Sequence, residues 1–335
     1  MSDKVVLDHG AGGGLSQELI TGTIAATLGD TYVGEMEDSA LVDVPTSRIA
    51  ITTDSFVVDP VFFSNGDIGK IAVAGTVNDL AVSGARPLYL TLAVVLEEGF
   101  PLLELRRVLE SVRDAARAAG VKIVAGDTKV VRRGEADGIF ITTTGVGALE
   151  RPVHLSSRSL RPGDRVIVTG YLGDHSIHIL SLREGLGFED RVHSDCAVLN
   201  HAIASLLDSC QGVRCIRDIT RGGLGTVLNE FAAASACTIQ LCEADLPIRP
   251  ETAMAADMLG VDVMYLANEG NLCVVVDGST VDDALAALHR HEETARAAVV
   301  GEVAHGSAGE VYLTERSGRR RTVDLLYGAQ LPRLC

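Results

Sequence analysis

The sequence predicts an α/β protein of the mixed, α+β kind, built from two domains. The chain has 335 residues, which is more than one hydrophobic core usually serves. Strand-like and helix-like segments alternate in both halves, so each half can form its own sheet with its own helices. Hydrophobic residues make up 47% of the chain, but tryptophan is absent and aromatic residues make up only 4%. Ala, Val, Leu and Ile must therefore fill both cores.

Several segments of the first half have the apolar spacing of regular structure. Pro101 and Gly120 bracket an amphipathic segment, which is typical of the start and end of a helix. Asp67 to Val82 keeps an apolar face at helical spacing. The predicted helices are 16–28, 67–82 and 101–119, and the predicted strands are 49–53, 89–96, 121–125 and 139–145.

A polar stretch between Arg151 and Asp164 contains Pro, Ser and Gly and predicts the domain boundary. We therefore expect an N-terminal domain over 1–150 and a C-terminal α/β domain over 151–326. The second half has predicted strands at 166–169, 238–242, 272–276 and 299–303, and predicted helices at 196–207, 224–236, 251–259 and 281–291. Residues 327–335 are expected to form a mobile tail that ends in Cys335.

The net charge of −16 excludes the basic surface that nucleic-acid binding needs. An anionic substrate such as ATP then has to be held locally, by backbone amides, helix N-termini, a few basic side chains and metal ions. No stretch approaches the roughly 18 to 20 apolar residues of a membrane span. The polar Met1–Lys4 segment predicts no signal peptide, and we expect a cytoplasmic protein without a membrane partner.

The seven cysteines are odd in number and form no CxxC motif, so neither a disulfide framework nor a zinc ribbon is expected. Six of them lie in apolar or helical contexts and are predicted to be inert, buried thiols. Two pairs of histidines, His175 with His178 and His289 with His291, have no other ligand-type residues nearby in the sequence. They are predicted to be surface residues.

Standard nucleotide-binding signatures are absent, because the chain has neither a P-loop motif nor a GxGxxG motif after a strand. Acidic residues instead follow predicted strands, as Asp54 and Asp127 do. Their oxygens suit Mg²⁺, although an isolated Asp after a strand is often only a turn or cap residue. Asn78 and Asp79 interrupt an apolar helix, which favours a role in a site over a solvated surface.

Two glycine-rich segments are candidates for holding phosphate. The backbone amides of His9–Gly14 can wrap an anion, and the loop over 218–225 leads into a predicted helix whose N-terminus attracts negative charge. The alternatives are a flexible N-terminal segment for the first and an ordinary tight turn for the second.

Seven motifs together resemble one known family, and the resemblance extends from end to end of the chain. They are His9-Gly10-Ala11-Gly12-Gly13, Glu35-Met36-Glu37-Asp38-Ser39-Ala40, Thr52-Thr53-Asp54-Ser55-Phe56, the run from Gly75 to Ala85 with Asn78-Asp79 at its centre, Ala125-Gly126-Asp127-Thr128-Lys129-Val130, Asp218-Ile219-Thr220-Arg221-Gly222-Gly223 and Pro332-Arg333-Leu334-Cys335. This set is similar to the HypE family, the carbamoyl dehydratases of [NiFe]-hydrogenase maturation. The final Pro-Arg-Leu-Cys is the most specific of the motifs, although Leu334 is often Ile in relatives.

The resemblance implies a two-domain PurM-like fold, shared with aminoimidazole ribonucleotide synthetase and selenophosphate synthetase. The N-terminal domain is then the ATP- and Mg²⁺-binding domain, and it pairs with its counterpart in a homodimer. The implied metal ligands are Asp38, Asp54, Asp79 and Asp127. The implied ATP- and phosphate-binding residues are Gly10, Gly12, Gly13, Asn78 and Thr128.

The family's reaction starts when a carbamoyltransferase places a carbamoyl group on the terminal thiol, here that of Cys335. ATP then drives loss of water to leave a thiocyanate, which supplies the cyanide ligand of the hydrogenase iron through an iron-carrying scaffold complex. Lys129 is positioned in sequence to neutralise phosphate charge, and Glu269 to accept a proton if burial raises its pKa. Otherwise Lys129 is a solvated strand-end residue and Glu269 a turn residue before Gly270.

Two other functions remain open from the sequence. One is a small-molecule kinase or synthetase of the same superfamily, which has no need of a terminal cysteine. A selenophosphate synthetase is disfavoured because no cysteine precedes Cys196. The other is a non-catalytic carrier of a thiol-bound group, which has no use for the acids.

Overall fold

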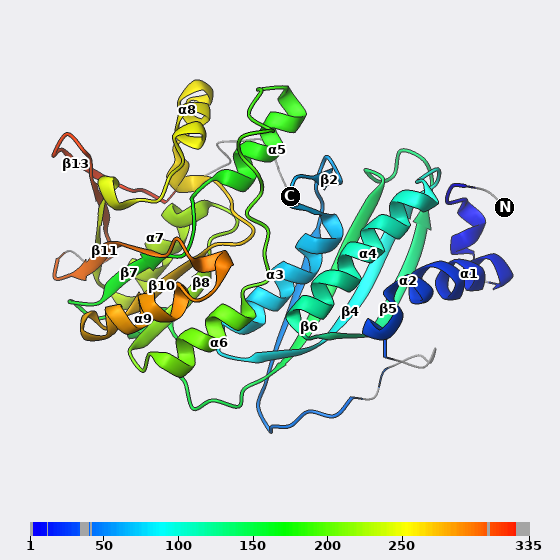
Figure 1. Ribbon diagram of the computed structural model, residues 1–335, viewed down its shortest axis with the longest axis horizontal. Coiled ribbons are helices and arrows are strands. Elements are labelled where there is room, and N and C mark those ends of the chain that lie inside the picture. The colour runs from blue at the N-terminus through cyan, green and yellow to red at the C-terminus, as the bar shows by residue number, and fades with distance from the viewer. Residues whose placement is uncertain (1–2, 12, 34–39, 41, 307–308, 326–335) are drawn as a thin grey trace. The chain divides into compact units, whose positions relative to one another are not determined.

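A computed structural model describes residues 3–11, 13–33, 40, 42–306 and 309–325 (Figure 1). The chain forms two compact units. The first contains the residues up to Leu80 together with Ala85–Glu150, and the second contains Ala81–Gly84 and the described residues from Arg151 onward. Each unit combines one main sheet with helices, so the predicted α/β class is confirmed.

The first unit is built on a four-stranded sheet in the order β1-β6-β4-β5. These strands are Ile49–Phe56 (β1), Ile139–Ala148 (β6), Arg86–Glu97 (β4) and Lys122–Val131 (β5). β4 and β5 run parallel and are joined by helix α4 (Leu102–Ala119), whereas β6 is antiparallel to both β1 and β4. Parallel neighbours need such a crossover connection. Helix α3 (Ile68–Val82) and α4 lie across one face of this sheet (Figure 1).

Helix α4 shows how the local sequence sets these elements. Its buried residues Leu105, Val108, Leu109 and Val112 recur at helical spacing, and they face the sheet. The helix ends at Gly120, whose φ of 73° belongs to the left-handed region that glycine adopts without strain. The predicted bounds of 101–119 therefore differ from the observed ones by a single residue.

The N-terminal segment and a short hairpin complete the first unit. The helix predicted over 16–28 instead begins at Gly13 and consists of α1 (Gly13–Leu19), a π-helical stretch (Ile20–Ala25) and α2 (Ala26–Leu28). It is preceded by the 3₁₀ turn η1 (Leu7–Gly10) and followed by η3 (Gly29–Thr31). The hairpin pairs β2 (Phe62–Phe63) with β3 (Gly66–Asp67).

The second unit is built on a seven-stranded sheet in the order β13-β12-β9-β11-β7-β10-β8. The strands are β7 (Arg165–Val168), β8 (Val213–Asp218), β9 (Thr238–Cys242), β10 (Leu272–Val276), β11 (Ala298–Ala304), β12 (Val311–Thr314) and β13 (Arg320–Thr322). The helices are α5 (Asp174–Glu184), α6 (Asn200–Ser209), α7 (Gly223–Ser235), α8 (Pro250–Leu259) and α9 (Val281–Leu288). β10 is antiparallel to both of its neighbours, β7 and β8.

The core of the second unit lies on both faces of this sheet. Cys273 and Val275 of β10 pack with α7 residues such as Phe231 in one cluster. Val274, on the opposite face of β10, packs with residues of α6 and α9 in another, for example Leu206. Every residue of β10 is consequently buried, which explains its continuous apolar sequence.

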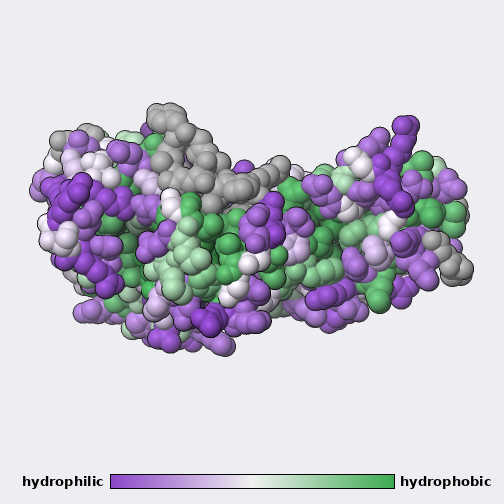
Figure 2. Space-filling model, turned by 90° about the horizontal axis from the view of Figure 1, so that it is seen from above, coloured by the Kyte–Doolittle hydropathy of each residue, from purple (hydrophilic) through white to green (hydrophobic). Residues whose placement is uncertain are grey.

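The surface carries charged and apolar residues side by side. Figure 2 shows hydrophilic residues interspersed with apolar ones over the face that it presents. Among the helices of the described part of the chain, none has both the length and the apolar character that crossing a membrane requires.

Candidate active site

Two of the predicted site acids, Asp54 and Asp79, lie where helix α3 packs on edge strand β1. The hydroxyl of Thr52 donates to Oδ2 of Asp79 over 2.8 Å. Asp54 follows two residues later on β1, on the same face of the strand as Thr52, because side chains alternate between the faces. Both carboxylates are half-buried. We call Asp54, Asn78 and Asp79 the β1–α3 group.

Small and hydroxyl-bearing residues allow this close packing of helix on sheet. A Cβ atom on Gly75 would stand 3.0 Å from ring carbons of Phe56, so glycine lets α3 approach β1. The hydroxyls of Thr76 and Thr143 are hydrogen-bonded to each other, and Thr143 also donates to the carbonyl of Ala72 over 3.1 Å. Asn78 is buried, with 3% of its surface exposed, so it is not a solvated residue.

A second group of predicted residues lies along β5, at the other edge of the sheet. Asp127 and Lys129 are exposed, and Thr128 between them is half-buried. Gly10 packs against the same strand, since a Cβ atom on it would stand 2.9 Å from both Cβ and the backbone nitrogen of Val130. The structure therefore places the start of the glycine-rich segment against β5 at Val130, whose side chain shares a face of the strand with Thr128 and not with Asp127 and Lys129. Gly13, the first residue of α1, follows closely in the chain.

The register of the sheet separates these two groups within one chain. Asp127 pairs with Ala93, Ala93 with Thr142, and Thr142 with Ser55. Directly paired residues share a face of a sheet, so Asp127 shares a face with Ser55 and lies opposite to the face of Asp54. Three strand spacings also separate the edges by about 14 Å. Consistently, the described residues hold no cluster of three or more His, Cys, Asp or Glu side chains that suits a metal ion.

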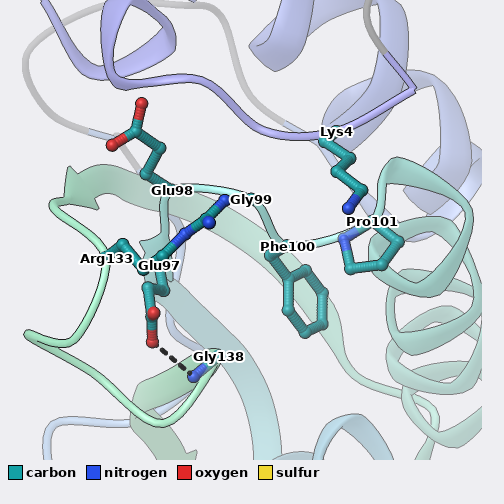
Figure 3. A pocket seen from close by; sticks show the side chains of 8 residues that line it. All are labelled: Lys4, Glu97, Glu98, Gly99, Phe100, Pro101, Arg133 and Gly138. Carbon is teal, nitrogen blue, oxygen red and sulfur yellow. Dashed lines mark hydrogen bonds between the residues drawn. The ribbon is translucent and has the colours of Figure 1, made fainter.

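An open pocket of ≈ 380 Å³ lies elsewhere in the first unit, where β4 leads into α4 (Figure 3). Lys4, Glu98 and Arg133 are among its lining residues, and none of the predicted site residues is. Glu97 accepts hydrogen bonds from the amides of Gly134 and Gly138, at 2.9 and 3.2 Å. These two amides lower the pKa of Glu97. This carboxylate therefore fixes the β5–β6 connection and has no evident catalytic task.

Glu269 belongs to the second unit, in the turn that leads into β10. It is nearly buried, with 9% of its surface exposed. The flanking asparagines are buried too and hold the turn to neighbouring loops. Asn268 accepts the amide of Gly173 at 2.8 Å and donates to the carbonyl of Ile219 at 2.9 Å. Asn271 accepts the Thr169 hydroxyl at 2.9 Å. Glu269 is therefore anchored where β7 and β8 end.

A buried polar cluster, which sequence reasoning missed, surrounds this turn. Asp195 accepts the amide of Glu269 through Oδ1 at 2.9 Å. Asp174 accepts from Thr252 and from Arg249, both at 2.6 Å. Burial raises the pKa of the Asp174 carboxyl, against the lowering effect of these donors. No motif marks Asp195 in the sequence, since it lies in an irregular segment far from Glu269 along the chain.

The prediction that His175 and His178 are surface residues is wrong. Both lie on α5 and are buried, at 0% and 1% exposure. Nδ1 of His175 is 2.8 Å from the hydroxyl of Ser194, and Nδ1 of His178 is 2.7 Å from the carbonyl of Val192. Burial lowers the pKa of His175 to about 3, and it also lowers that of His178. Both are neutral members of the polar interior at neutral pH.

The cysteines in the described part of the chain are free, and most are buried as predicted. Cys196, Cys210, Cys215 and Cys273 are buried, whereas Cys237 and Cys242 are partly exposed. Burial raises the pKa of the Cys215 thiol to about 11 and raises that of Cys273 further still. Such thiols are inert, because the thiolate is the reactive form.

The glycine-rich loop between β8 and α7 is a tight turn. Gly222 and Gly223 have φ angles of 79° and 62°, which glycine adopts without strain. A Cβ atom on Gly223 would stand 2.6 Å from the carbonyl oxygen of Met264. Glycine is therefore required here for packing, whether or not an anion binds. Three further predicted residues, Gly12, Asp38 and Cys335, lie outside the described residues.

Comparison with known proteins assigns both halves of the chain. The family model of AIR synthase related proteins matches twice, its N-terminal domain over residues 36–149 and its C-terminal domain over residues 161–314. Carbamoyl dehydratase HypE of Azotobacter vinelandii is 45% identical over 332 residues, which cover 99% of this chain and 97% of the relative. Its Escherichia coli K12 counterpart is 44% identical, with 99% and 100% covered.

Solved structures agree with this assignment. A hydrogenase maturation protein HypE in complex with ATP superposes with a TM-score of 0.93 at 40% identity, over 98% of this chain and 99% of that one. The HypE chain of a HypE–HypF complex gives a TM-score of 0.80 at 42% identity, covering 84% and 92%. Thiamine monophosphate kinase of Aquifex aeolicus, with a TM-score of 0.62 at 20% identity over 86% and 93%, shares the fold. The predicted PurM-like fold is confirmed.

Proposed function

Because this chain belongs to the HypE family of carbamoyl dehydratases, we propose that it uses ATP to remove water from a carbamoyl group on the thiol of Cys335. The product is a thiocyanate, which supplies the cyanide ligand of a [NiFe]-hydrogenase iron. The observation that carries this proposal is the near-complete coverage of HypE relatives, one of which was solved in complex with ATP. A small-molecule kinase and a passive thiol carrier are both disfavoured by it.

The reaction has two steps whose atoms balance. In the first, the carbamoyl oxygen attacks the γ-phosphorus of ATP, so that ADP leaves and one N–H proton is released. In the second, phosphate leaves from carbon as the remaining N–H proton is removed and the C≡N bond forms. Hydroxide is a poor leaving group, which is why phosphorylation is needed. Phosphoryl transfer depends mainly on positioning and on neutralising charge.

We assign the phosphate end of the site to the first unit. The amides of the Gly10–Gly13 segment, with Thr128, bind phosphate oxygens, and the ammonium group of Lys129 neutralises charge that develops there. Asn78, the member of the β1–α3 group that is not an acid, is proposed to bind phosphate as well. The packing of Gly10 against Val130 of β5 and the exposure of Lys129 on the same strand support these roles.

The acids of this unit fit Mg²⁺. Asp54 and Asp79 offer half-buried carboxylate oxygens, and Thr52 orients one of them. Mg²⁺ is usually bound by one or two carboxylates together with substrate phosphates and water. One or two acids near each ion are therefore enough. We propose Asp38, Asp54, Asp79 and Asp127 as its ligands. When bound, the metal neutralises phosphate charge.

We assign proton removal to Glu269. Its nearly complete burial and its anchored turn give a carboxylate with a defined position, as a general base requires. The thiol that carries the substrate is that of Cys335, within the proposed mobile tail over 327–335. We further propose the domains 1–150 and 151–326, with the first responsible for ATP binding and pairing.

The partners follow from the chemistry. A carbamoyltransferase must load Cys335, and an iron-carrying scaffold complex must accept the cyanide group. One HypE relative was solved as a HypE–HypF complex, which supports a partner of this kind. A homodimer is supported by the face of β1 opposite α3, on which Ile49 and Ile51 are 43% and 64% exposed. We also propose a cytoplasmic location.

The test is the mass of the C-terminal peptide after incubation with a carbamoyltransferase, carbamoyl phosphate and Mg-ATP. We expect a carbamoyl adduct on Cys335 that loses one water only when ATP is present. An unmodified Cys335 beside an active transferase contradicts the proposal. A carbamoyl adduct that persists in the presence of ATP would show that the chain only carries the group and does not dehydrate it.

A further inference from the structure

We propose that Asp195 is a positioning residue for Glu269, whose turn it fixes through a partly buried carboxyl–amide hydrogen bond. The inference rests on the proposed function, in which Glu269 removes a proton during water loss. It adds a residue that no motif in the sequence marks and that the family-wide motifs above do not include.

The contact between the two segments is close and specific. Oδ1 of Asp195 accepts the backbone amide of Glu269 at 2.9 Å. Directly after it, Gly270 packs so tightly that a Cβ atom there would stand 1.8 Å from the carbonyl oxygen of Asp195. The amide of Ala197 in turn reaches the carbonyl of Glu269 at 3.5 Å. Side chain and backbone of the 195–197 segment thus hold Glu269 from one side.

One oxygen of the Asp195 carboxyl is isolated from solvent, although the residue as a whole is only half-buried. Its Oδ2 is buried without a hydrogen-bond partner in the part of the chain that the structure describes. Burial raises the pKa of Asp195 to about 7, the amide of Glu269 lowers it, and the neighbouring carboxylate of Asp174 raises it. Asp174 itself is paired with Arg249 at 2.6 Å. A neutral carboxyl at Asp195 is closely mimicked by asparagine, which keeps the accepting oxygen.

The hydrogen bond matters for catalysis because it is made to the backbone of Glu269 itself. Without an acceptor, a buried amide is left unsatisfied and the turn shifts to find another partner. Proton transfer requires heavy atoms within about 2.6 to 3.2 Å, and a displacement of about 1 Å can cost about 100-fold in rate. The rate of water loss should therefore depend on the oxygen atom of residue 195, while ATP binding by the first unit should not.

The experiment measures the first-order rate constant of water loss from carbamoylated Cys335 over a range of Mg-ATP concentrations. We expect Asp195→Ala to lower this rate constant at saturating ATP by about tenfold or more. We expect its half-saturating ATP concentration to stay within about twofold. Asp195→Asn, which retains the acceptor, should keep at least about a third of the rate. Glu269→Gln serves as the reference for loss of the proton acceptor.

A destabilised control separates positioning from general loss of stability. Thr294→Val removes a buried hydroxyl that donates to the carbonyl of Leu288, away from the Glu269 turn. It should lower the melting temperature, as we also expect of Asp195→Ala, without slowing water loss. An Asp195→Ala chain as fast as the wild type, beside a slow Glu269→Gln chain, overturns this inference alone. So does an Asp195→Asn chain as slow as Asp195→Ala. A fast Glu269→Gln chain, or a wild-type chain that never loses water, overturns the role of Glu269 and this inference with it.

Discussion

Thr52 of strand β1 donates its hydroxyl to Oδ2 of Asp79 on helix α3 over 2.8 Å. This bond joins the edge strand to the helix at the point where two proposed metal ligands, Asp54 and Asp79, lie. It also occupies one lone pair of the Asp79 carboxylate, so the carboxylate is held in one orientation. A metal ligand that is oriented in advance binds more tightly than a free one.

Removing this hydroxyl should weaken metal binding. We expect Thr52→Val, which conserves shape, to raise the Mg²⁺ concentration for half-maximal ATP-dependent water loss by roughly tenfold. The rate constant at saturating Mg²⁺ should change less, because the carboxylates themselves remain. A titration of Mg²⁺ at fixed ATP measures both.

The matched control is Thr46→Val, which removes a hydroxyl bonded to the carbonyl of Leu149 at 3.4 Å in the same unit. It should leave the Mg²⁺ requirement unchanged. Equal Mg²⁺ requirements for Thr52→Val and the wild type would show that this hydrogen bond does not orient a metal ligand.

Gly270 is predicted to be indispensable for packing. A Cβ atom there collides with the carbonyl oxygen of Asp195, a backbone atom that cannot rotate away. We expect Gly270→Ala to destabilise the fold by about 2 kcal/mol or more and to abolish water loss, because the Glu269 turn has to move. Thermal unfolding and the Cys335 mass assay measure these two effects.

Gly22→Ala provides the comparison, since its Cβ meets nothing closer than an atom of Glu18 at 4.0 Å. Alanine favours helix by up to about 1 kcal/mol over glycine, so this variant should be at least as stable as the wild type. A Gly270→Ala chain with wild-type stability would show that the turn accommodates the methyl group.

The sequence predicts the elements best where local pattern and tertiary packing agree. Helix α4 and strand β10 match their predicted ranges closely, because each carries the periodicity of its burial: helical for α4, and continuous for a strand buried on both faces. Helix α5 was not predicted. Its sequence contains Asp174, His175, Ser176 and His178, which are polar yet buried. A helix whose buried face is polar shows no apolar residues at helical spacing, so the sequence pattern does not reveal it.

The candidate site divides in the same way. Acids that follow strands, and the Asn78–Asp79 pair within a helix, are recognisable from the chain alone because each breaks a local pattern. The sequence does not reveal that Asp54 and Asp127 lie at opposite edges of the sheet. Their separation depends on the strand order, which the sequence leaves open. Asp195 is likewise invisible, because its importance arises from a contact with Glu269 across 74 positions.

Protonation of Asp195 predicts a pH dependence of stability. Its pKa rises from 3.8 to about 7 on folding, so between these values the folded chain binds more protons than the unfolded chain. The free energy of unfolding that Asp195 contributes therefore falls as pH rises from about 4 to about 7, and is level above that. Asparagine cannot ionise, so Asp195→Asn should gain melting temperature relative to the wild type over this range.

The measurement is the difference in melting temperature between Asp195→Asn and the wild type at pH 5, 6, 7 and 8, values chosen to span the transition. Asp174 and His175 also have shifted pKa values, but they are present in both chains and cancel to first order. A difference that stays constant with pH would mean that Asp195 is charged throughout.

The proposed homodimer makes a prediction about how the two acidic groups combine. Asp54 and Asp127 lie at opposite edges of one sheet and on opposite faces, so a single chain does not bring them together. We expect sites that join the β1–α3 group of one chain with β5 of the partner. Asp54→Asn and Asp127→Asn chains should each be inactive by themselves. When the two variants are dissociated and reassociated together, half of the dimers are mixed, and one of the two sites in each mixed dimer is intact. The mixture should therefore regain about a quarter of the wild-type sites.

The control mixture combines Asp54→Asn with Asp79→Asn, which damage the same β1–α3 group. In that mixture every composite site contains one damaged group, so no activity should return. Sedimentation equilibrium checks that each variant remains a dimer. Recovery in the first mixture and none in the second requires a site shared between chains, since a site formed within one chain stays broken in both. Absence of recovery in the first mixture, with mixed dimers present, would place all the acids of a site in one chain and require the β5 edge to act separately from β1.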